Sequence, residues 1–185
     1  MTKINSNNAN PGRPTSSDVF FIIFLVCVLS LLGWLGSLAY KEGMKTEVTK
    51  HNGEAWANWF SEVSHERFSE NYPTMQCAGI STTHSDIHTW GECLTFVTAN
   101  EPTLANLTNP FSTEPLAFVS KCDKEDRSLS GSIVVEKLTP TPAGSSIPFT
   151  TSPLITEDRI DQKMQLHITM CDNDGYPIHI SDIEF

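Results

Sequence analysis

The chain has 185 residues with 22 acidic and 12 basic side chains, so its formal net charge at pH 7 is −10. Residues 41–185 carry 21 of the acidic and 10 of the basic side chains, a net of −11. Such a surface repels the phosphate backbone of nucleic acids, and we therefore expect no nucleic-acid partner. The 145 residues after position 40 suffice for one ordinary domain with its own core.

An uncharged apolar stretch occupies residues 19–40, a run of 22 residues in which Leu, Ile, Val and Phe dominate. As a helix with about 1.5 Å of rise per residue, roughly 20 apolar residues cross a hydrocarbon core of about 30 Å. Trp34 and Tyr40 lie toward its C-terminal end, where aromatic side chains favour the lipid–water interface. The stretch predicts a single transmembrane helix surrounded by membrane lipid.

Two interpretations of this stretch remain, an uncleaved anchor or a removable signal. Ser37-Leu38-Ala39 has the small-x-small form of a signal-peptidase site, so cleavage after Ala39 is the alternative. The apolar run is longer than the roughly 7–15 residues typical of a signal's hydrophobic region. Residues 1–18 are polar and rich in Asn, Ser, Thr and Pro, which predicts a disordered tail. We favour the uncleaved anchor.

The side of the membrane that carries residues 41–185 follows from the cysteines rather than from the basic residues. Basic side chains lie on both sides of the span, and long domains translocate largely regardless of them. An even set of four cysteines without C-x-x-C spacing is expected of disulfides in an oxidising compartment. These four are Cys77, Cys93, Cys122 and Cys171. We expect an inner (plasma) membrane protein whose C-terminal domain is extracytoplasmic.

Helical periodicity continues beyond the span, over residues 41–70. Apolar side chains recur at three- and four-residue steps, which marks one face of an amphipathic helix. They are Met44, Val48, Ala55, Trp56, Trp59, Phe60 and Val63. Joined to the span, this segment predicts one helix of nearly 50 residues, with Gly43 and residues 52–53 as weak points where it could bend. The aromatic cluster is interpreted as a core face, with a protein–protein contact as the alternative.

A shorter second helix is expected at about residues 86–99, where Ile87, Trp90, Leu94 and Val97 share one face. Leu104 and Leu107 then favour one further helical turn. Short, β-branched and partly alternating segments follow, which predict strands. These segments are 116–121, 131–138, 164–171 and 177–185, with a long surface loop at 139–153.

The last two strands carry the clearest local signals. Residues 172–175, Asp-Asn-Asp-Gly, have hairpin chemistry because these residues tolerate positive φ. In the final strand Ile178 and Ile180 have one parity, whereas Ile183 and Phe185 have the other, so a bulge near residues 181–182 would bring both pairs to the core. The fold class expected is α+β, with a long N-terminal helix (membrane half plus amphipathic half) packed on a roughly four-stranded antiparallel sheet.

Four cysteines allow three connectivities. We prefer Cys77 with Cys93, which joins the segment after the long helix to the short helix, and Cys122 with Cys171, which joins the first expected strand to the third. Each bridge would stabilise the domain by roughly 2–4 kcal/mol.

Groups with catalytic or metal-binding potential are few. His84 and His88 stand four residues apart with Asp86 between them, but the sequence supplies no third ligand. Asp172 and Asp174 resemble the start of a calcium loop whose later ligands are missing. The chain contains no G-x-S-x-G and no phosphate-binding glycine loop. We therefore expect a protein that is not an enzyme and that carries no metal and no cofactor.

The layout of an apolar helix continued by an amphipathic helix, a short helix and a disulfide-braced antiparallel sheet resembles the type IV pilins and pseudopilins of bacteria. The resemblance implies that residues 19–40 form the assembly segment, residues 41–68 pack on the sheet, and Cys122–Cys171 is the terminal disulfide. Gly12 is followed by Arg13-Pro14, and no glutamate precedes Glu42, so the leader-cleavage motif and the acidic residue of the mature pilin terminus are not matched.

The resemblance implies a structural or assembly subunit that self-associates, or packs with partner helices, as a homo-oligomer or filament. The residues expected to carry assembly and packing are Val19, Phe20, Phe21, Leu25, Leu31, Trp34, Trp56, Trp59 and Phe60. The alternative is a single-pass anchored binding module that holds a partner through the sheet and the loop at 139–153. An extracytoplasmic hydrolase is a third class, for which the sequence offers no motif.

Overall fold

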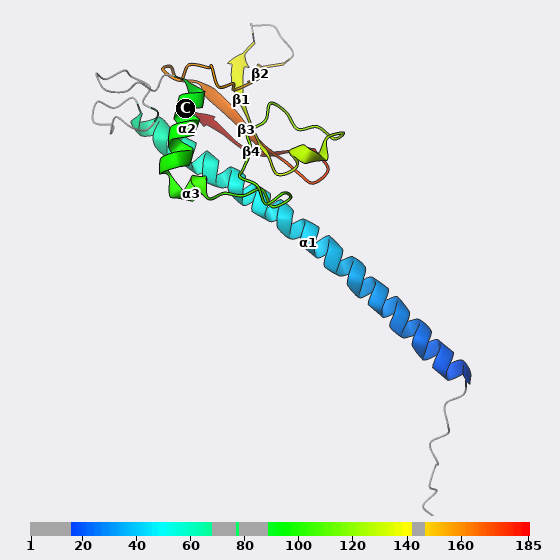
Figure 1. The fold of residues 1–185 in the computed structure, drawn as a ribbon. Helices are drawn as coiled ribbons and strands as arrows, with labels where there is room; N and C mark the ends of the chain where they lie inside the picture. Colours follow the sequence, from blue (N-terminus) through cyan, green and yellow to red (C-terminus); the bar gives the residue numbers. More distant parts are fainter. Residues whose placement is uncertain (1–15, 68–76, 78–88, 142–146) are drawn as a thin grey trace, which may run out of the picture. The chain divides into compact units, whose positions relative to one another are not determined.

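The structure, a computed structural model, describes residues 16–67, 77, 89–141 and 147–185. The chain divides into two compact units, Met1–Lys41 and Glu42–Phe185. The first helix, α1 (Ser16–Glu66), supplies the described part of the first unit and continues into the second (Figure 1). The expectation of one long helix across the apolar and amphipathic segments is therefore confirmed. Residues 68–70 of the expected helix lie outside the described residues.

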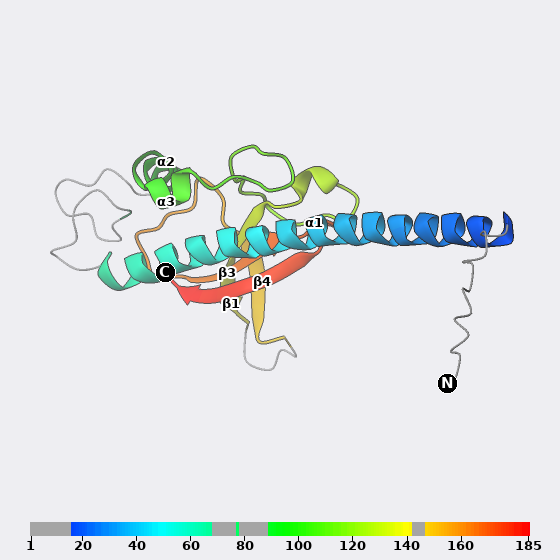
Figure 2. The ribbon, with the colours of Figure 1, turned by 90° about the horizontal axis from the view of Figure 1, so that it is seen from below.

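The second unit is a mixed α+β domain, as expected. Its further elements are α2 (Trp90–Asn100), α3 (Pro102–Ala105), the short 3₁₀ helix η1 (Arg127–Leu129), β1 (Ile133–Pro140), β2 (Phe149–Pro153), β3 (Gln165–Cys171) and β4 (Pro177–Glu184). The strands form one antiparallel sheet in the order β2-β1-β3-β4. Within this unit the C-terminal part of α1 lies along the sheet (Figure 2).

The buried face of α1 differs in part from the expected one. It consists of Thr49, Asn52, Gly53, Trp56, Ala57, Trp59, Phe60 and Val63. Met44 and Val48, which the periodicity placed on this face, are 49 % and 43 % exposed, so that part of the prediction is wrong. Full burial of α1 begins only at Thr49, although Lys45 already contacts Phe111, and apolar character alone does not show where burial begins.

Gly53 is a packing site rather than a bend. A Cβ at this position would lie 2.7 Å from Cγ of Met170 and 2.9 Å from Cγ1 of Ile180, so only glycine lets β3 and β4 approach the helix this closely. Beside it, Asn52 is buried and its side-chain amide donates to the carbonyl of Thr108 at 3.0 Å. The helical conformation of the expected weak point is held by these tertiary contacts.

Arg67 fixes the end of α1 although it is a buried cation. Its guanidinium donates to the carbonyls of Ile160 and Gln162, each at 2.8 Å, and lies 3.9 Å from the ring centroid of Phe185. Burial of an arginine is stable where its N–H groups find acceptors and its plane stacks on an aromatic ring. Arg67 thus ties the helix end to the segment before β3 and to the C-terminal residue.

α2 begins at Trp90 because Thr89 caps it. The Thr89 hydroxyl accepts from the backbone N–H of Glu92, and the Glu92 carboxylate accepts from the backbone N–H of Thr89, a reciprocal capping box. Of the expected helical face, Trp90 and Val97 are buried, and Leu94 packs against the core. Residues 86–88 lie outside the described residues. The expected extra turn is α3, where Leu104 is buried.

Two strand predictions are wrong. Residues 116–121 form no strand; Phe118 makes only an isolated parallel bridge to Ile133. The expected surface loop at 139–153 instead contains β2, all of whose residues are exposed, paired with the second half of β1. β2 is an edge strand held by backbone hydrogen bonds rather than by burial, so its Thr- and Pro-rich composition resembles that of a loop.

The last hairpin matches its sequence signals closely. The Asp172 carboxylate accepts from the backbone N–H groups of Asp174 and Tyr176, and Gly175 has φ of 75°. The expected bulge is present one residue earlier than predicted. Ile168 pairs with Ser181 and Thr169 pairs with His179, which leaves Ile180 as the extra residue of β4.

Two disulfides brace the domain. The structure joins Cys77 to Cys93 and Cys122 to Cys171, with Cα–Cα distances of 5.1 and 5.3 Å. This is the connectivity preferred from the sequence. The first bridge attaches α2 to residue 77, and the second attaches the end of β3 to the segment before η1.

Candidate functional site

The apolar part of α1 is the first candidate surface. Every residue from Ser16 to Met44 is exposed, including the expected assembly residues Val19, Phe20, Phe21, Leu25, Leu31 and Trp34. Among the described residues, α1 is the one helix long and apolar enough to cross a membrane. A helix that is apolar on all sides is stable where lipid or other helices surround it. α1 can therefore serve as a membrane anchor.

The other expected packing residues lie inside the second unit. Trp56, Trp59 and Phe60 are 1 %, 8 % and 0 % exposed. Trp56 meets Phe118 edge to face with ring centroids 4.9 Å apart, and Phe60 meets Phe185 in the same way at 5.0 Å. These aromatic side chains form the centre of the core and leave no surface for a partner.

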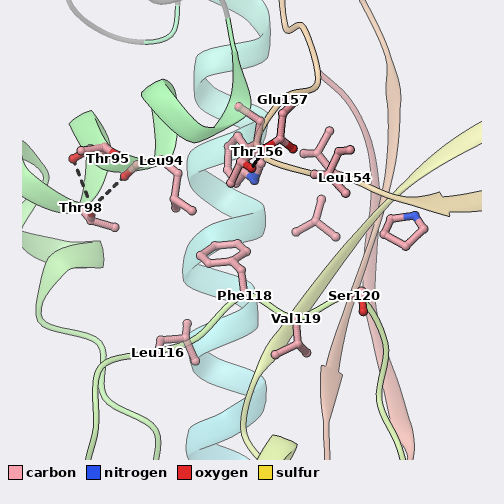
Figure 3. Close-up of a pocket in the computed structure, with 14 residues that line it drawn as sticks. Leu94, Thr95, Thr98, Leu116, Phe118, Val119, Ser120, Leu154, Thr156 and Glu157 are labelled. Atoms are coloured by element: carbon pink, nitrogen blue, oxygen red, sulfur yellow. Dashed lines mark hydrogen bonds between the residues drawn. The ribbon is translucent and has the colours of Figure 1, made fainter.

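A groove of about 700 Å³ opens beside α2 (Figure 3). Three segments line it: Leu94, Thr95 and Thr98 from α2, then Leu116 with Phe118 to Ser120, and then Pro153 to Glu157, with Trp90 and Val135 completing the wall. Its volume lies within the range of small-ligand pockets, which is roughly 300–1,000 Å³.

The chemistry of this groove favours contact over catalysis. The Thr98 hydroxyl donates to the carbonyls of Leu94 and Thr95, and the Thr95 hydroxyl donates to that of Gly91, so both are engaged by their own helix. Glu157 is the single ionisable residue among those that line the groove. No acid–base pair or activated nucleophile faces this space within the described chain.

A cluster of ionisable side chains lies on the face of the sheet opposite α1. Nδ1 of His167 in β3 is 2.5 Å from Oδ1 of Asp182 in β4, and Nε2 of His179 is 3.4 Å from the same oxygen. The two imidazole rings stack with centroids 4.8 Å apart. The hydrogen bond from His167, followed by the one from His179, lowers the pKa of the Asp182 carboxyl below its ordinary value.

The bulge at Ile180 creates this cluster. In a regular strand, residues three apart point to opposite faces, so His179 and Asp182 would be separated by the sheet. The extra residue places both on the face that also carries His167. The ligand atoms of the three side chains lie within 4.8 Å of one another, so these residues could hold a metal ion.

The sequence interpretation missed this cluster although its signal was present. Strand alternation puts His167 on the face opposite Leu166 and Ile168, and the two parities of the last strand predicted a bulge. Combining the two with the register of the hairpin at 172–175 would have brought His179 and Asp182 beside His167. The pair that was considered, His84 and His88, lies outside the described residues. Asp172 and Asp174 serve the hairpin turn, as expected.

Comparison of the chain with protein-family models, with curated proteins and with solved structures gives no match in any of the three. The long apolar helix on a four-stranded antiparallel sheet is compatible with a pilin-like layout.

Proposed function

We propose that this protein is a non-enzymatic, single-pass membrane-anchored envelope protein, built like a pilin subunit, whose N-terminal helix packs with partner helices or with copies of itself. Residues 19–40 lie in the inner membrane, and the second unit lies on its extracytoplasmic side. The observation that carries the proposal is the uncharged stretch 19–40 of α1, which exposes apolar side chains on every side. Lipid and neighbouring helices are the surroundings that suit it.

The small residues of the span indicate which face associates. In lipid, helices associate where small side chains let the backbones approach, because no hydrophobic force drives them together. Cys27, Ser30, Gly33 and Ser37 recur at three- and four-residue steps and therefore share one face of the helix. Val28 and Leu32 lie on the other side, which carries small residues only further along, at Gly36 and Ala39.

Cysteine crosslinking in native membranes tests this assembly. Cys27 is the one free cysteine, since the other four are in disulfides. Single cysteines are placed by Ser30→Cys or by Val28→Cys, each in a Cys27→Ser background, and are oxidised with copper phenanthroline, which enters the bilayer and joins neighbouring thiols as disulfides. We expect Ser30→Cys to give covalent dimers and Val28→Cys to give few. Equal yields would indicate random collisions, and a strictly monomeric protein at both positions would contradict self-association through this helix.

The extracytoplasmic location is supported by the two disulfides, because such bonds persist in oxidising compartments. Thiol labelling of intact cells with and without reductant tests it. We expect Cys77, Cys93, Cys122 and Cys171 to react only after reduction. Free thiols at all four positions would place the domain in the cytoplasm.

The groove beside α2 favours a second candidate, an anchored module that binds a partner or ligand through its domain. Photo-crosslinking distinguishes the two. Partners captured from positions in 19–40 support assembly, whereas partners captured only from Thr95, Thr98 or the exposed residues of β2 support the binding module.

A further inference from the structure

We propose that His167, His179 and Asp182 bind a late first-row divalent cation of the Zn²⁺ class on the outer face of the sheet. Two imidazole nitrogens and one carboxylate oxygen would supply three ligands, and water would complete the coordination. The inference does not depend on how the N-terminal helix assembles.

The spacing of the donor atoms suits such an ion. Metal–ligand bonds of about 2.0–2.1 Å in a tetrahedral zinc site place neighbouring ligand atoms roughly 3.3–3.5 Å apart. Nε2 of His179 already lies 3.4 Å from Oδ1 of Asp182, while Nδ1 of His167 lies closer, at 2.5 Å. A small rotation of the Asp182 carboxylate separates it from His167 and opens the centre of the three donors, all within 4.8 Å of one another.

The backbone that carries these ligands is fixed. His167 and Asp182 are direct cross-strand partners, and His179 is paired with Thr169 of the same neighbouring strand. Behind them, Ile180 and Ile183 pack against the core, and Ile180 also faces Gly53 of α1. The ligands therefore need only side-chain rotation, which lowers the cost of forming the site.

Solvent access and charge favour a cation here. The side chains of His167, His179 and Asp182 are 26 %, 54 % and 56 % exposed, so an ion can enter and water can fill open positions. Glu136 is the cross-strand partner of His167 on β1, whereas Glu184, on the same face of β4 as Asp182, is already paired with Lys163 at 3.1 Å. Glu136 and the net acidic charge of the chain raise the local concentration of cations.

The ligand types select the metal class. Two imidazoles suit Zn²⁺, Cu²⁺ or Ni²⁺, whereas Mg²⁺ and Ca²⁺ require sets of oxygen ligands that this cluster lacks. A bound ion would join β3 to the edge strand β4. Because the site exists only in the folded domain, binding would also raise the stability of that domain.

Calorimetric titration of the full chain with ZnCl₂ tests the site, in mild detergent with excess MgCl₂ and without a histidine tag. We expect one Zn²⁺ per chain. His179→Gln and Asp182→Asn should each lower the affinity by roughly 10- to 100-fold or more, because mutation of a residue that only hydrogen-bonds to a metal ligand already lowers affinity by that factor. Cobalt(II) should give visible absorption bands of a four- or five-coordinate site in the wild type that both variants lose.

Two control variants separate this site from other histidines. His51→Gln removes a histidine that is 81 % exposed and whose Nδ1 lies 3.9 Å from the carboxylate of Glu54. The double variant His84→Gln/His88→Gln removes the pair suggested by the sequence. Both controls should bind Zn²⁺ as the wild type does. Absence of binding in the wild type, or binding that survives His179→Gln but not the double variant, would overturn the proposal.

Discussion

The two parts of α1 use apolar side chains in different ways. Residues 19–40 expose theirs on all sides, and Trp34 is 62 % exposed, whereas from Thr49 onward the helix buries one face and Trp56 is 1 % exposed. The first part bears no charged side chain; the second carries several on the side away from the sheet, such as Glu54 and Glu62. The same secondary structure thus suits two surroundings, and the distribution of charge distinguishes them.

The difference predicts which substitutions each part tolerates. In the first part the free energy of membrane insertion depends on transfer of side chains into lipid, so an added charge should be costly and a change of side-chain shape should not. In the second part the free energy of unfolding depends on close packing against the sheet, so a change of side-chain volume should be costly. Matched pairs of substitutions test this difference, from the largest expected effect to the smallest.

The largest effect is expected for charges placed in the span. Phe24→Arg/Leu29→Arg adds two arginines near the middle of the apolar stretch, at about 2.5–3.5 kcal/mol each for membrane insertion. We expect the chain to leave the membrane fraction on carbonate extraction. Asn58→Arg, on the exposed side of α1 in the second unit, should leave it membrane-bound. If the double variant stayed in the membrane, the span would lie elsewhere.

Removal of a tryptophan should affect the two parts unequally. Trp56→Ala deletes a core side chain and should lower the free energy of unfolding of the domain by about 3–5 kcal/mol. Trp34→Ala should leave it unchanged. Denaturant unfolding of the purified chain in detergent, followed by near-ultraviolet circular dichroism, measures both. Equal effects would show that the assigned core is wrong.

Glycines give a similar comparison at smaller magnitude. Gly53→Leu forces a side chain against Met170 and Ile180 and should destabilise the domain by about 1–3 kcal/mol or more. A Cβ at Gly33 would meet no atom within 4 Å in the chain, so Gly33→Leu should not change domain stability. A neutral Gly53→Leu would mean that β3 and β4 do not approach the helix as described.

The smallest of these effects concerns the end of α1. Arg67→Lys keeps the positive charge but loses the paired donation to Ile160 and Gln162 and the stacking on Phe185, at a cost of about 1–2 kcal/mol. The same unfolding measurement should detect the loss. Lys50→Arg, a partly exposed helix position, is the control, and its stability should be unchanged.

The sequence alone predicts the structure where a pattern of side chains fits only one environment. Helical spacing identified Trp56, Phe60 and Val63, because this set faces a single core. The turn at 172–175 follows from local hydrogen bonds that the sequence specifies directly.

The sequence was insufficient where distant parts of the chain decide the outcome. The largely apolar residues 116–121 suit a strand but make only the isolated bridge at Phe118, while every residue of strand β2 is exposed, so burial gives no signal for it. Glycine weakens an isolated helix, but Gly53 lets α1 pack closely on the sheet. This role depends on its neighbours in β3 and β4 and is therefore not visible in the local sequence. His167, His179 and Asp182 meet because of a bulge in a register that pairs two strands.

The location of Cys27 tests the central claim, that residues 19–40 lie in lipid, most directly. Membranes opened to both sides are treated with a membrane-impermeant maleimide, and labelling of Cys27 is compared with that of Asn58→Cys in a Cys27→Ser background. We predict that Asn58→Cys reacts and that Cys27 does so only after detergent is added. Labelling of Cys27 at the same rate as Asn58→Cys, in intact bilayers, would contradict a membrane-embedded helix.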